Sequence, residues 1–269
     1  MKTIEIIIPA YNCRSTLDRT LDSLDKQTDK DFAVHFIDDC STEDLSDIIA
    51  AHNTLNIRVT RNPVNLGCGM TRQVGIDSTE ADYIAFVDSD DVLLSHAVQT
   101  WRMAANAHPD TDVFHSYFFE QKVEDGQESI SLKTDGYTWC HGKLYKVSNI
   151  RKYDIRNNPE IKYMDDSFFN SMCTELGNVM TICSPLYIWM NNSSSATRDG
   201  RMSKDACRYD FIHGMILSTE FVYSKGVKTI KHMSNTLKML EGIKHEFSEK
   251  TLNEYNKLLN IINEVKTYG

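Results

Sequence analysis

The first hundred residues alternate between short apolar runs and segments with helical periodicity, and this alternation constrains the fold more than any other feature. The apolar runs cover residues 4–8, 32–37, 57–60 and 83–87. Each is short and carries little charge, as is typical of strands buried on both faces of a sheet. Strands that alternate with helices form a parallel sheet with right-handed crossovers. The sequence therefore predicts an α/β fold for this part of the chain.

Helix starts are expected between these strands. Ser15 and Ser41 each precede an aspartate by three positions, a pattern typical of helix N-termini, and Ser95 is a third candidate cap. Apolar residues follow at helical spacing, and residues 70–76 form a further expected helix.

Beyond residue 112 the alternation stops. Residues 113–119 are expected to form a strand, residues 121–133 a hairpin or loop, and residues 151–162 irregular structure. The remainder after residue 204 is expected to be mainly helical because apolar residues recur there with helical period. The clearest stripe consists of Leu252, Tyr255, Leu259 and Ile262.

Composition excludes several classes of protein. The net charge is −9, from 38 acidic and 29 basic residues, which argues against a surface built for nucleic-acid backbones. The seven cysteines form no C-x-x-C pair, which favours reduced thiols over disulfides or a zinc site. The opening apolar run is too short for a signal peptide, and no stretch reaches transmembrane length. We expect a cytoplasmic protein; peripheral association with the inner face of a membrane stays open.

Polar residues gather where the predicted strands end, and ligands bind at the carboxyl ends of parallel strands. The most acidic of these clusters is Asp88-Ser89-Asp90-Asp91. Its carboxylates repel one another unless a cation neutralises them, and in extended backbone Asp88 and Asp90 point the same way. Oxygen ligands of this kind suit Mn²⁺ or Mg²⁺ with a phosphate as partner. The alternative is a solvated acidic turn that caps the next helix.

Two further clusters are less specific. Asp39 follows the second strand, and its carboxylate could accept a hydrogen bond from a base N–H or a ribose hydroxyl. Gly67, Gly69 and Arg72 precede a helix and could admit a phosphate or a base closely. A plain turn and helix start is the alternative for both clusters.

Taken together, these elements resemble family 2 glycosyltransferases of the GT-A fold. The matching segments are Ile6-Ile7-Ile8-Pro9-Ala10-Tyr11-Asn12, residues 37–44, residues 65–72 and residues 86–91. Departures are mild: Cys40 stands where glycine is usual, and Thr71 and Gln73 flank Arg72 where alanine and asparagine are common.

The resemblance continues more weakly beyond residue 100. Residues 142–146 look like the "KLY" segment of relatives that build capsular and surface polysaccharides. Residues 163–170 resemble their "E-D-x-x-F-N" segment, with Asp165 where glutamate is usual. Residues 186–198, which end in Arg198, are similar to a stretch that borders the donor site.

The resemblance implies a Rossmann-like, mostly parallel central sheet flanked by helices, with a helical C-terminal extension. It implies a donor-binding subdomain at 1–110, an acceptor-binding and catalytic subdomain at 111–204, and the extension at 205–269. The implied reaction moves a sugar, with inversion, from a nucleotide-sugar donor, with UDP the expected nucleotide, to a saccharide or lipid-linked saccharide.

Site roles follow from the same resemblance. Asp166 is the implied general base, with Asp165 beside it, and Asp90 with Asp88 is the implied site for Mn²⁺ or Mg²⁺. The donor is expected to contact Pro9, Tyr11, Asp39, Arg72, Asp88, Ser89 and Arg198. The alternatives are a glycosyltransferase acting on a modified nucleic-acid base, a nucleotidyltransferase, and an inactive binding module of the same fold.

Overall fold

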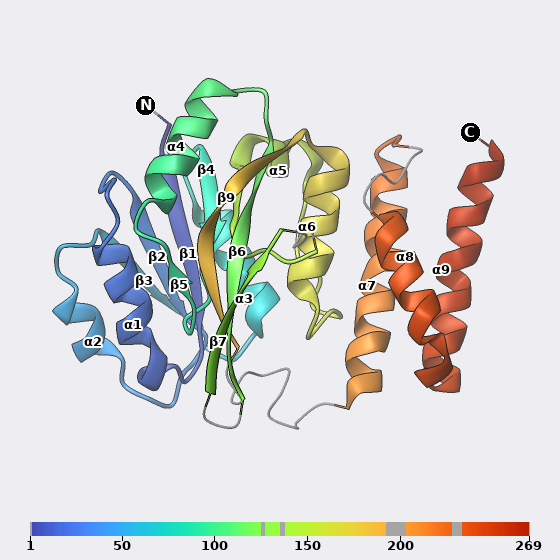
Figure 1. Ribbon diagram of the computed structural model, residues 1–269, viewed down its shortest axis with the longest axis horizontal. Coiled ribbons are helices and arrows are strands. Elements are labelled where there is room, and N and C mark those ends of the chain that lie inside the picture. Colours follow the sequence, from blue (N-terminus) through green and yellow to red (C-terminus); the bar gives the residue numbers. More distant parts are fainter. Residues whose placement is uncertain (1, 125–126, 135–137, 192–202, 228–232, 269) are drawn as a thin grey trace.

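The computed structural model describes residues 2–124, 127–134, 138–191, 203–227 and 233–268. A single twisted sheet forms its centre, with helices on both faces and a group of helices at one side (Figure 1). The strands are β1 (Ile4–Ala10), β2 (Ala33–Asp38), β3 (Ile57–Arg61), β4 (Tyr83–Phe86), β5 (Val92–Leu93), β6 (Val113–Glu124), β7 (Gln127–Lys133), β8 (Lys143–Lys146) and β9 (Val179–Asn191). The helices are α1 (Arg14–Asp25), α2 (Ser46–Ala51), α3 (Cys68–Ser78), α4 (Ala97–Ala107), α5 (Val147–Tyr153), α6 (Asp165–Leu176), α7 (Lys204–Ser224), α8 (Met233–Ile243) and α9 (Glu249–Tyr268), with a 3₁₀ turn at Lys244–Glu246.

The strand order is β3-β2-β1-β4-β8-β6-β9-β5, and β7 pairs with β6. Strands β1 to β4 run parallel, as the alternation predicts. Strand β8 is antiparallel to both β4 and β6. Strand β7 pairs antiparallel with β6, and β5 pairs antiparallel with β9. The α/β class is confirmed, and the mostly parallel sheet holds for the first half only. The second half is mixed because β6 and β7 form the expected hairpin and β8 enters between β4 and β6.

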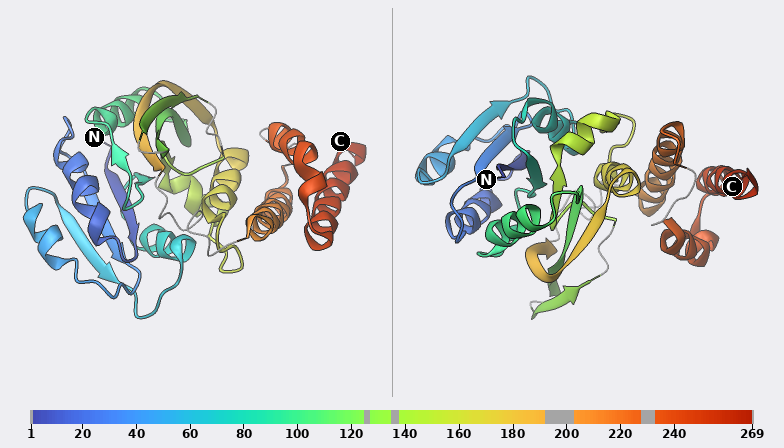
Figure 2. Two further views of the ribbon diagram at one scale, coloured as in Figure 1. Left: turned by 60° about the horizontal axis from the view of Figure 1, so that its bottom comes forward. Right: turned by 90° about the horizontal axis from the view of Figure 1, so that it is seen from above.

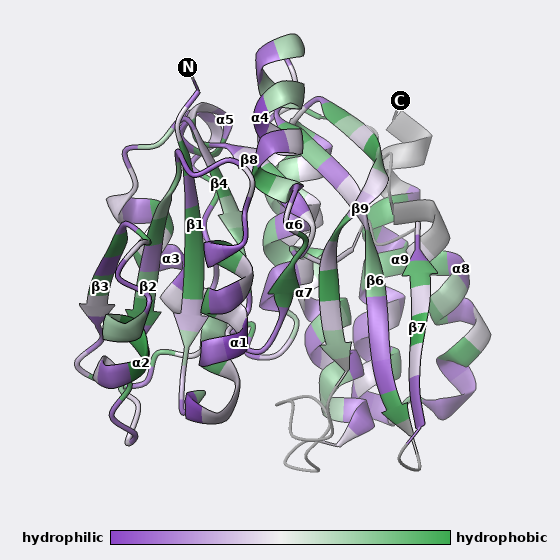
Figure 3. Cartoon of the chain, turned by 60° about the vertical axis from the view of Figure 1, so that its left-hand side comes forward, coloured by the Kyte–Doolittle hydropathy of each residue, from purple (hydrophilic) through white to green (hydrophobic). Residues whose placement is uncertain are grey.

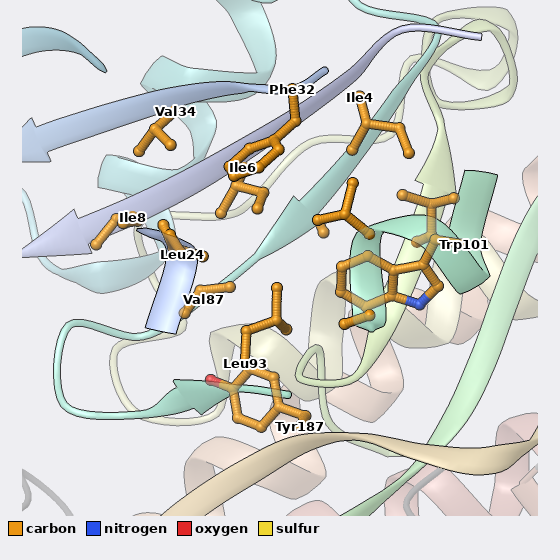
Figure 4. Packing of buried hydrophobic residues seen from close by; sticks show 14 of the residues in the cluster. Ile4, Ile6, Ile8, Leu24, Phe32, Val34, Val87, Leu93, Trp101 and Tyr187 are labelled. Carbon is orange, nitrogen blue, oxygen red and sulfur yellow. The ribbon is translucent and has the colours of Figure 1, made fainter. Parts of the chain in front are cut away.

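The first half packs in three layers because both faces of the parallel strands are apolar. Along β1, Ile6 faces Leu24 of α1 and Trp101 of α4, and all three side chains are fully buried (Figure 4). Ile7 points to the opposite face, where α3 packs. A Cβ on Gly75 would lie 2.7 Å from Ile7 Cγ2, so α3 can approach the sheet this closely only with glycine there. Burial of each apolar side chain of this size contributes about 1.5–3 kcal/mol to the stability of the fold.

Helix starts differ from the predictions. Helix α1 begins at Arg14, α2 at Ser46 and α4 at Ala97, and none of these three described helices has a side-chain cap of its own. Ser41 instead accepts a hydrogen bond from the Asn12 amide at 2.9 Å, and so ties the end of β1 to the loop after β2. Ser15 thus lies two positions after the observed N-cap of α1, Cys13. Ser41 and Ser95 lie four and one positions before the N-caps Leu45 and His96, and for Ser41 a loop contact competes with capping.

Helix α5 occupies part of the segment predicted to be irregular. Helices α7 to α9 confirm the helical C-terminal part, and Figure 2 shows α7 between α6 and the other two. In the predicted stripe Tyr255 and Ile262 are buried, whereas Leu252 is 38% exposed and Leu258 is fully buried instead. Figure 3 shows β1 apolar along most of its length and mixed polarity around α8. None of the described helices is long and apolar enough to cross a membrane.

Candidate functional site

Strands β1, β2 and β4 end at the same edge of the sheet, and their ends are joined by backbone hydrogen bonds. The Asp39 amide after β2 donates to the carbonyl of Ala10 at 2.7 Å, and the Val87 amide after β4 donates to the carbonyl of Ile7 at 3.1 Å. The acidic residues that follow β2 and β4 are therefore brought to one edge, as the parallel pattern predicts.

The segment after β4 is a turn, not extended backbone. The Asp91 amide donates to the carbonyl of Asp88 at 3.0 Å, so the prediction that Asp88 and Asp90 share a direction through strand alternation is wrong. Asp91 is buried and structural: its carboxylate accepts from the Tyr187 hydroxyl at 2.7 Å and from the Met190 amide at 2.8 Å. The turn leaves Asp88 and Asp90 half-buried at the sheet edge.

Tyr187 lies in the stretch that the resemblance placed at the border of the donor site, but the sequence assigned no role to it. Its hydroxyl also accepts from the Asp88 amide at 3.2 Å, so it fixes both ends of the turn. Figure 4 shows the ring beside Leu93, where β5 pairs with β9. Its contact with the turn could not be inferred from the sequence, because Asp88 lies about a hundred positions away in the chain.

Arg72 joins the two halves of the site. Its guanidinium is 5% exposed and pairs with Asp88 at 2.6 Å and with Asp165 at the start of α6. It also lies over the ring of Phe86, 5.7 Å from the centroid. The sequence placed Arg72 near the nucleoside; in the structure both of its terminal nitrogens bind carboxylates.

The close approach of α3 to α6 makes this bridge possible. A Cβ added at Gly69 would lie 2.6 Å from the Cβ of Asp165, which is shorter than real contacts allow. Glycine at this position therefore serves the packing of two helices, a different reason from the phosphate approach that the sequence suggested.

Asp165 and Asp166 have different surroundings. Asp165 is 5% exposed and ion-paired to Arg72; burial raises its pKa and the arginine opposes that rise. Asp166 is half-buried, and burial together with the negative charge of Asp165 raises its pKa from 3.8 to about 7. Its Oδ1 accepts from the Ser167 amide at 2.7 Å. A carboxylate with a pKa near neutrality is suited to general-base work.

The segment before β8 lies against Asp166. Cys140 Sγ donates to the Asp166 carbonyl at 3.2 Å. Nearby Lys143 is fully buried, its Nζ donates to the Trp139 carbonyl, and burial lowers its pKa to about 8. Lys143 belongs to the "KLY" segment, which the sequence singled out without assigning a role to it.

Asp39 is more deeply enclosed than a position at a strand end suggests. It is 3% exposed, and its carboxylate accepts from Asn62 Nδ2 at 2.8 Å and from the amides of Leu66 and Gly67 at 2.8 and 2.9 Å. It therefore holds the loop before α3, in which Gly67 adopts a φ of +82°.

The remaining predicted donor contacts are placed as follows. Pro9 is buried near the end of β1, and Tyr11 beyond it is 46% exposed. Ser89 lies in the turn, where its carbonyl accepts from the Thr16 hydroxyl at 2.9 Å. Arg198 lies outside the described residues.

No cluster of three or more potential ligands that could hold a metal occurs among the described His, Cys, Asp and Glu side chains. Asp88 and Asp90 nevertheless fit a cation of the Mg²⁺ type, which commonly takes only one or two carboxylates and completes its shell with phosphate oxygens and water. One oxygen of Asp88 binds Arg72.

Comparisons with known proteins agree with this geometry. The family model for Glycosyl transferase family 2 matches residues 5–173. The chain is 27% identical over 186 residues to the poly(ribitol-phosphate) beta-N-acetylglucosaminyltransferase TarS of Staphylococcus aureus, covering 63% of this chain and 32% of TarS. It is 37% identical over 91 residues to the UDP-Glc:alpha-D-GlcNAc-diphosphoundecaprenol beta-1,3-glucosyltransferase WfaP of Escherichia coli, covering 34% of this chain and 36% of WfaP. The chain thus spans about a third of these relatives.

Solved structures show the same fold. TarS residues 1–349 in complex with UDP-GlcNAc align with a TM-score of 0.78 at 18% identity, covering 98% of this chain and 81% of that one. The mannosyltransferase PcManGT of Pyrobaculum calidifontis, in complex with GDP-Man and Mn²⁺, aligns with a TM-score of 0.60 at 13% identity, covering 99% and 75%. The predicted GT-A class is confirmed by these likenesses.

Proposed function

Because the chain belongs to glycosyl transferase family 2, we propose that it transfers a sugar from a nucleoside-diphosphate donor to an acceptor hydroxyl with inversion. The observation that carries this proposal is the Arg72 bridge, which joins the Asp88 turn to the carboxylates that open α6. A donor-side acidic turn and a half-buried carboxylate are thereby fixed with respect to each other.

Asp166 takes the proton of the attacking hydroxyl. Its raised pKa makes the ionised carboxylate a stronger base than an ordinary aspartate, and Asp165 cannot substitute because Arg72 holds it. A single base acting on one face of the sugar, with direct displacement, inverts the anomeric centre.

On the donor side, Tyr11 offers an exposed ring for the base, and Asp39 holds the loop that borders it. Asp90 and Asp88 would hold Mn²⁺ or Mg²⁺, which neutralises the charge of the departing diphosphate when bound. UDP is the proposed nucleotide, supported by the UDP-GlcNAc complex of TarS and the UDP-Glc in the name of WfaP.

The proposed acceptor is a saccharide or lipid-linked saccharide. The names of TarS and WfaP refer to a polymer and to a diphosphoundecaprenol-linked sugar, which favours this class over a modified nucleic-acid base. A lipid-linked acceptor would bring the protein to the inner surface of a membrane.

A thermal-shift panel of UDP, GDP and their sugars, with and without Mn²⁺, tests donor class and metal together. A ligand present at a concentration a hundredfold above its Kd raises the free energy of unfolding by about 2.7 kcal/mol. Asp90→Asn keeps the shape and removes the charge, so its Mn²⁺-dependent shift with UDP should shrink. Asp22→Asn, at an exposed site on α1, is the control and should keep it. Equal shifts in Asp90→Asn and wild type would remove Asp90 from the metal site.

A further inference from the structure

The C-terminal helices contact the segment that leads into the catalytic carboxylates. Asp210 of α7 is 7% exposed, and its carboxylate faces the residues just before α6. It accepts hydrogen bonds from the backbone amides of Tyr163 at 2.9 Å, Met164 at 3.0 Å and Lys162 at 3.3 Å. One side chain from a distant helix thus binds three successive amides.

The N-cap position of helix α6 makes no side-chain cap hydrogen bond of its own. Met164 occupies the N-cap position and has no side-chain oxygen to bind the first amides of the helix. A carboxylate close to a helix N-terminus is also favoured by the helix dipole. Asp210 therefore holds the amide of the N-cap residue Met164 and the two amides before it, which lead directly into the first turn of α6.

The same face of α7 packs on the same segment. Gly214, one turn after Asp210, lies where a Cβ would be 3.6 Å from both Ile161 and Phe168. His213 Nε2 lies 3.7 Å from a carboxylate oxygen of Glu160, and His213 Nδ1 forms a hydrogen bond of 2.8 Å with Glu254 of α9. The contact at Asp210 is thus part of a continuous interface, which fixes α7 against the start of α6.

We propose that Asp210 is a positioning residue for the transfer reaction: it holds residues 162–164, and through them the Asp166 carboxylate, in the geometry that proton removal requires. This inference rests on the function proposed above, with Asp166 as base. It assigns to the C-terminal extension a part in catalysis through contact with the start of α6, without contact to substrate.

The variant Asp210→Asn keeps the size of the side chain and weakens its binding to the three amides. Misplacement of a reacting group by about 1 Å can cost on the order of a hundredfold in rate, so we expect kcat to fall about 10- to 100-fold. The affinity for UDP with Mn²⁺, measured by calorimetry, should stay at the wild-type value because the donor-side turn is untouched.

Asp205→Asn is the matched control. Asp205 lies on the same helix and also binds a backbone amide, that of Ser248 at 3.0 Å, but it faces α9 and not α6. It should keep the wild-type kcat. A similar loss of kcat in both variants, or a loss of UDP affinity together with kcat in Asp210→Asn, would indicate a general structural defect and overturn the proposal.

A double-mutant cycle tests whether Asp210 acts through Asp166. Residues that act as one unit are not additive. Asp166→Asn combined with Asp210→Asn should therefore transfer no more slowly than Asp166→Asn alone. A further 10-fold loss in the double variant would show independent action and overturn the proposal.

Hydrogen exchange provides a measurement that does not depend on activity. The amides of Tyr163 and Met164 should exchange on the order of tenfold faster in Asp210→Asn than in wild type, and unchanged in Asp205→Asn. This result stands even if the wild type transfers no sugar, which would refute the proposed function instead. Unchanged exchange, or a wild-type kcat in Asp210→Asn, overturns the positioning role.

Discussion

The two acidic segments of the site are held in different ways. The turn at residues 88–91 closes with its own backbone hydrogen bond, and neutral donors from β9 bind the carboxylate of Asp91. The start of α6 is held by charged groups from distant parts of the chain, Arg72 of α3 and Asp210 of α7. The first segment closes on itself and is fixed from β9, whereas the second is held by contacts from two other helices.

This difference has a chemical consequence. Neutral donors hold Asp91 of the turn, and Arg72 binds one oxygen of Asp88. The ion pair at Asp165 places a negative charge beside Asp166 in a poorly solvated position, and that combination raises the pKa of Asp166. The raised pKa of Asp166 therefore comes from long-range packing, and it should respond to mutations in helices remote in sequence.

The largest expected effect separates the two adjacent carboxylates. Asp166→Asn should lower kcat by about 10²- to 10⁴-fold and leave the affinity for donor nearly unchanged, because a general base acts only in the transition state. Steady-state transfer kinetics and calorimetry with UDP and Mn²⁺ measure the two quantities. If transfer persists near the wild-type rate, Asp166 is not the base.

The position of the turn at residues 88–91 could be predicted from the sequence better than the surroundings of the start of α6. Apolar runs and their parallel order determine which edge the residues after β1, β2 and β4 share, so Asp39 and the acidic turn could be placed together. The geometry of the turn at Asp91 could not be predicted from the sequence, because it depends on Tyr187, which belongs to a strand in the second half of the chain.

The bridge at Arg72 was also beyond sequence reasoning. Arg72 and Asp165 are 93 positions apart, and their pairing follows from the close approach of α3 and α6 at Gly69. The position of Asp166 next to the donor side was inferred from resemblance alone. Asp210 gave no signal, since a carboxylate in the middle of a helix looks like a solvated surface residue.

Asp165→Asn should affect the free energy of unfolding more strongly than it affects kcat. Removing one partner of a buried ion pair typically costs 3–5 kcal/mol, and since Arg72 keeps Asp88 we expect about 3 kcal/mol. Urea unfolding measures the loss, and kcat should fall less than in Asp166→Asn. Abolished transfer with unchanged stability would exchange the roles assigned to the two residues.

Gly69→Ala should disturb the ion pair between Arg72 and Asp165 from the side of α3. The added Cβ would meet Asp165 at 2.6 Å, and relief of such overpacking typically costs about 1–3 kcal/mol. Gly242→Ala is the control: nothing lies within 4 Å of its Cβ in α8, so it should stabilise by up to about 1 kcal/mol. Equal unfolding midpoints for the two variants would contradict close packing at Gly69.

The pH dependence of the wild type needs no mutation, and it reports the pKa of Asp166 directly. With that pKa raised from 3.8 to about 7, kcat/KM should fall about tenfold per pH unit below 7 and level off above it, because only the ionised carboxylate accepts a proton. Stability should move the opposite way. Between about pH 4 and 7 the folded state binds more protons than the unfolded state, so this group's contribution to stability falls as pH rises through that window. Asp166→Asn should remove both dependences, and relative to wild type it should gain stability above pH 7. An inflection in kcat/KM near pH 4 would show that Asp166 titrates as an ordinary exposed aspartate, and the contrast between the two acidic segments would then lose its chemical meaning.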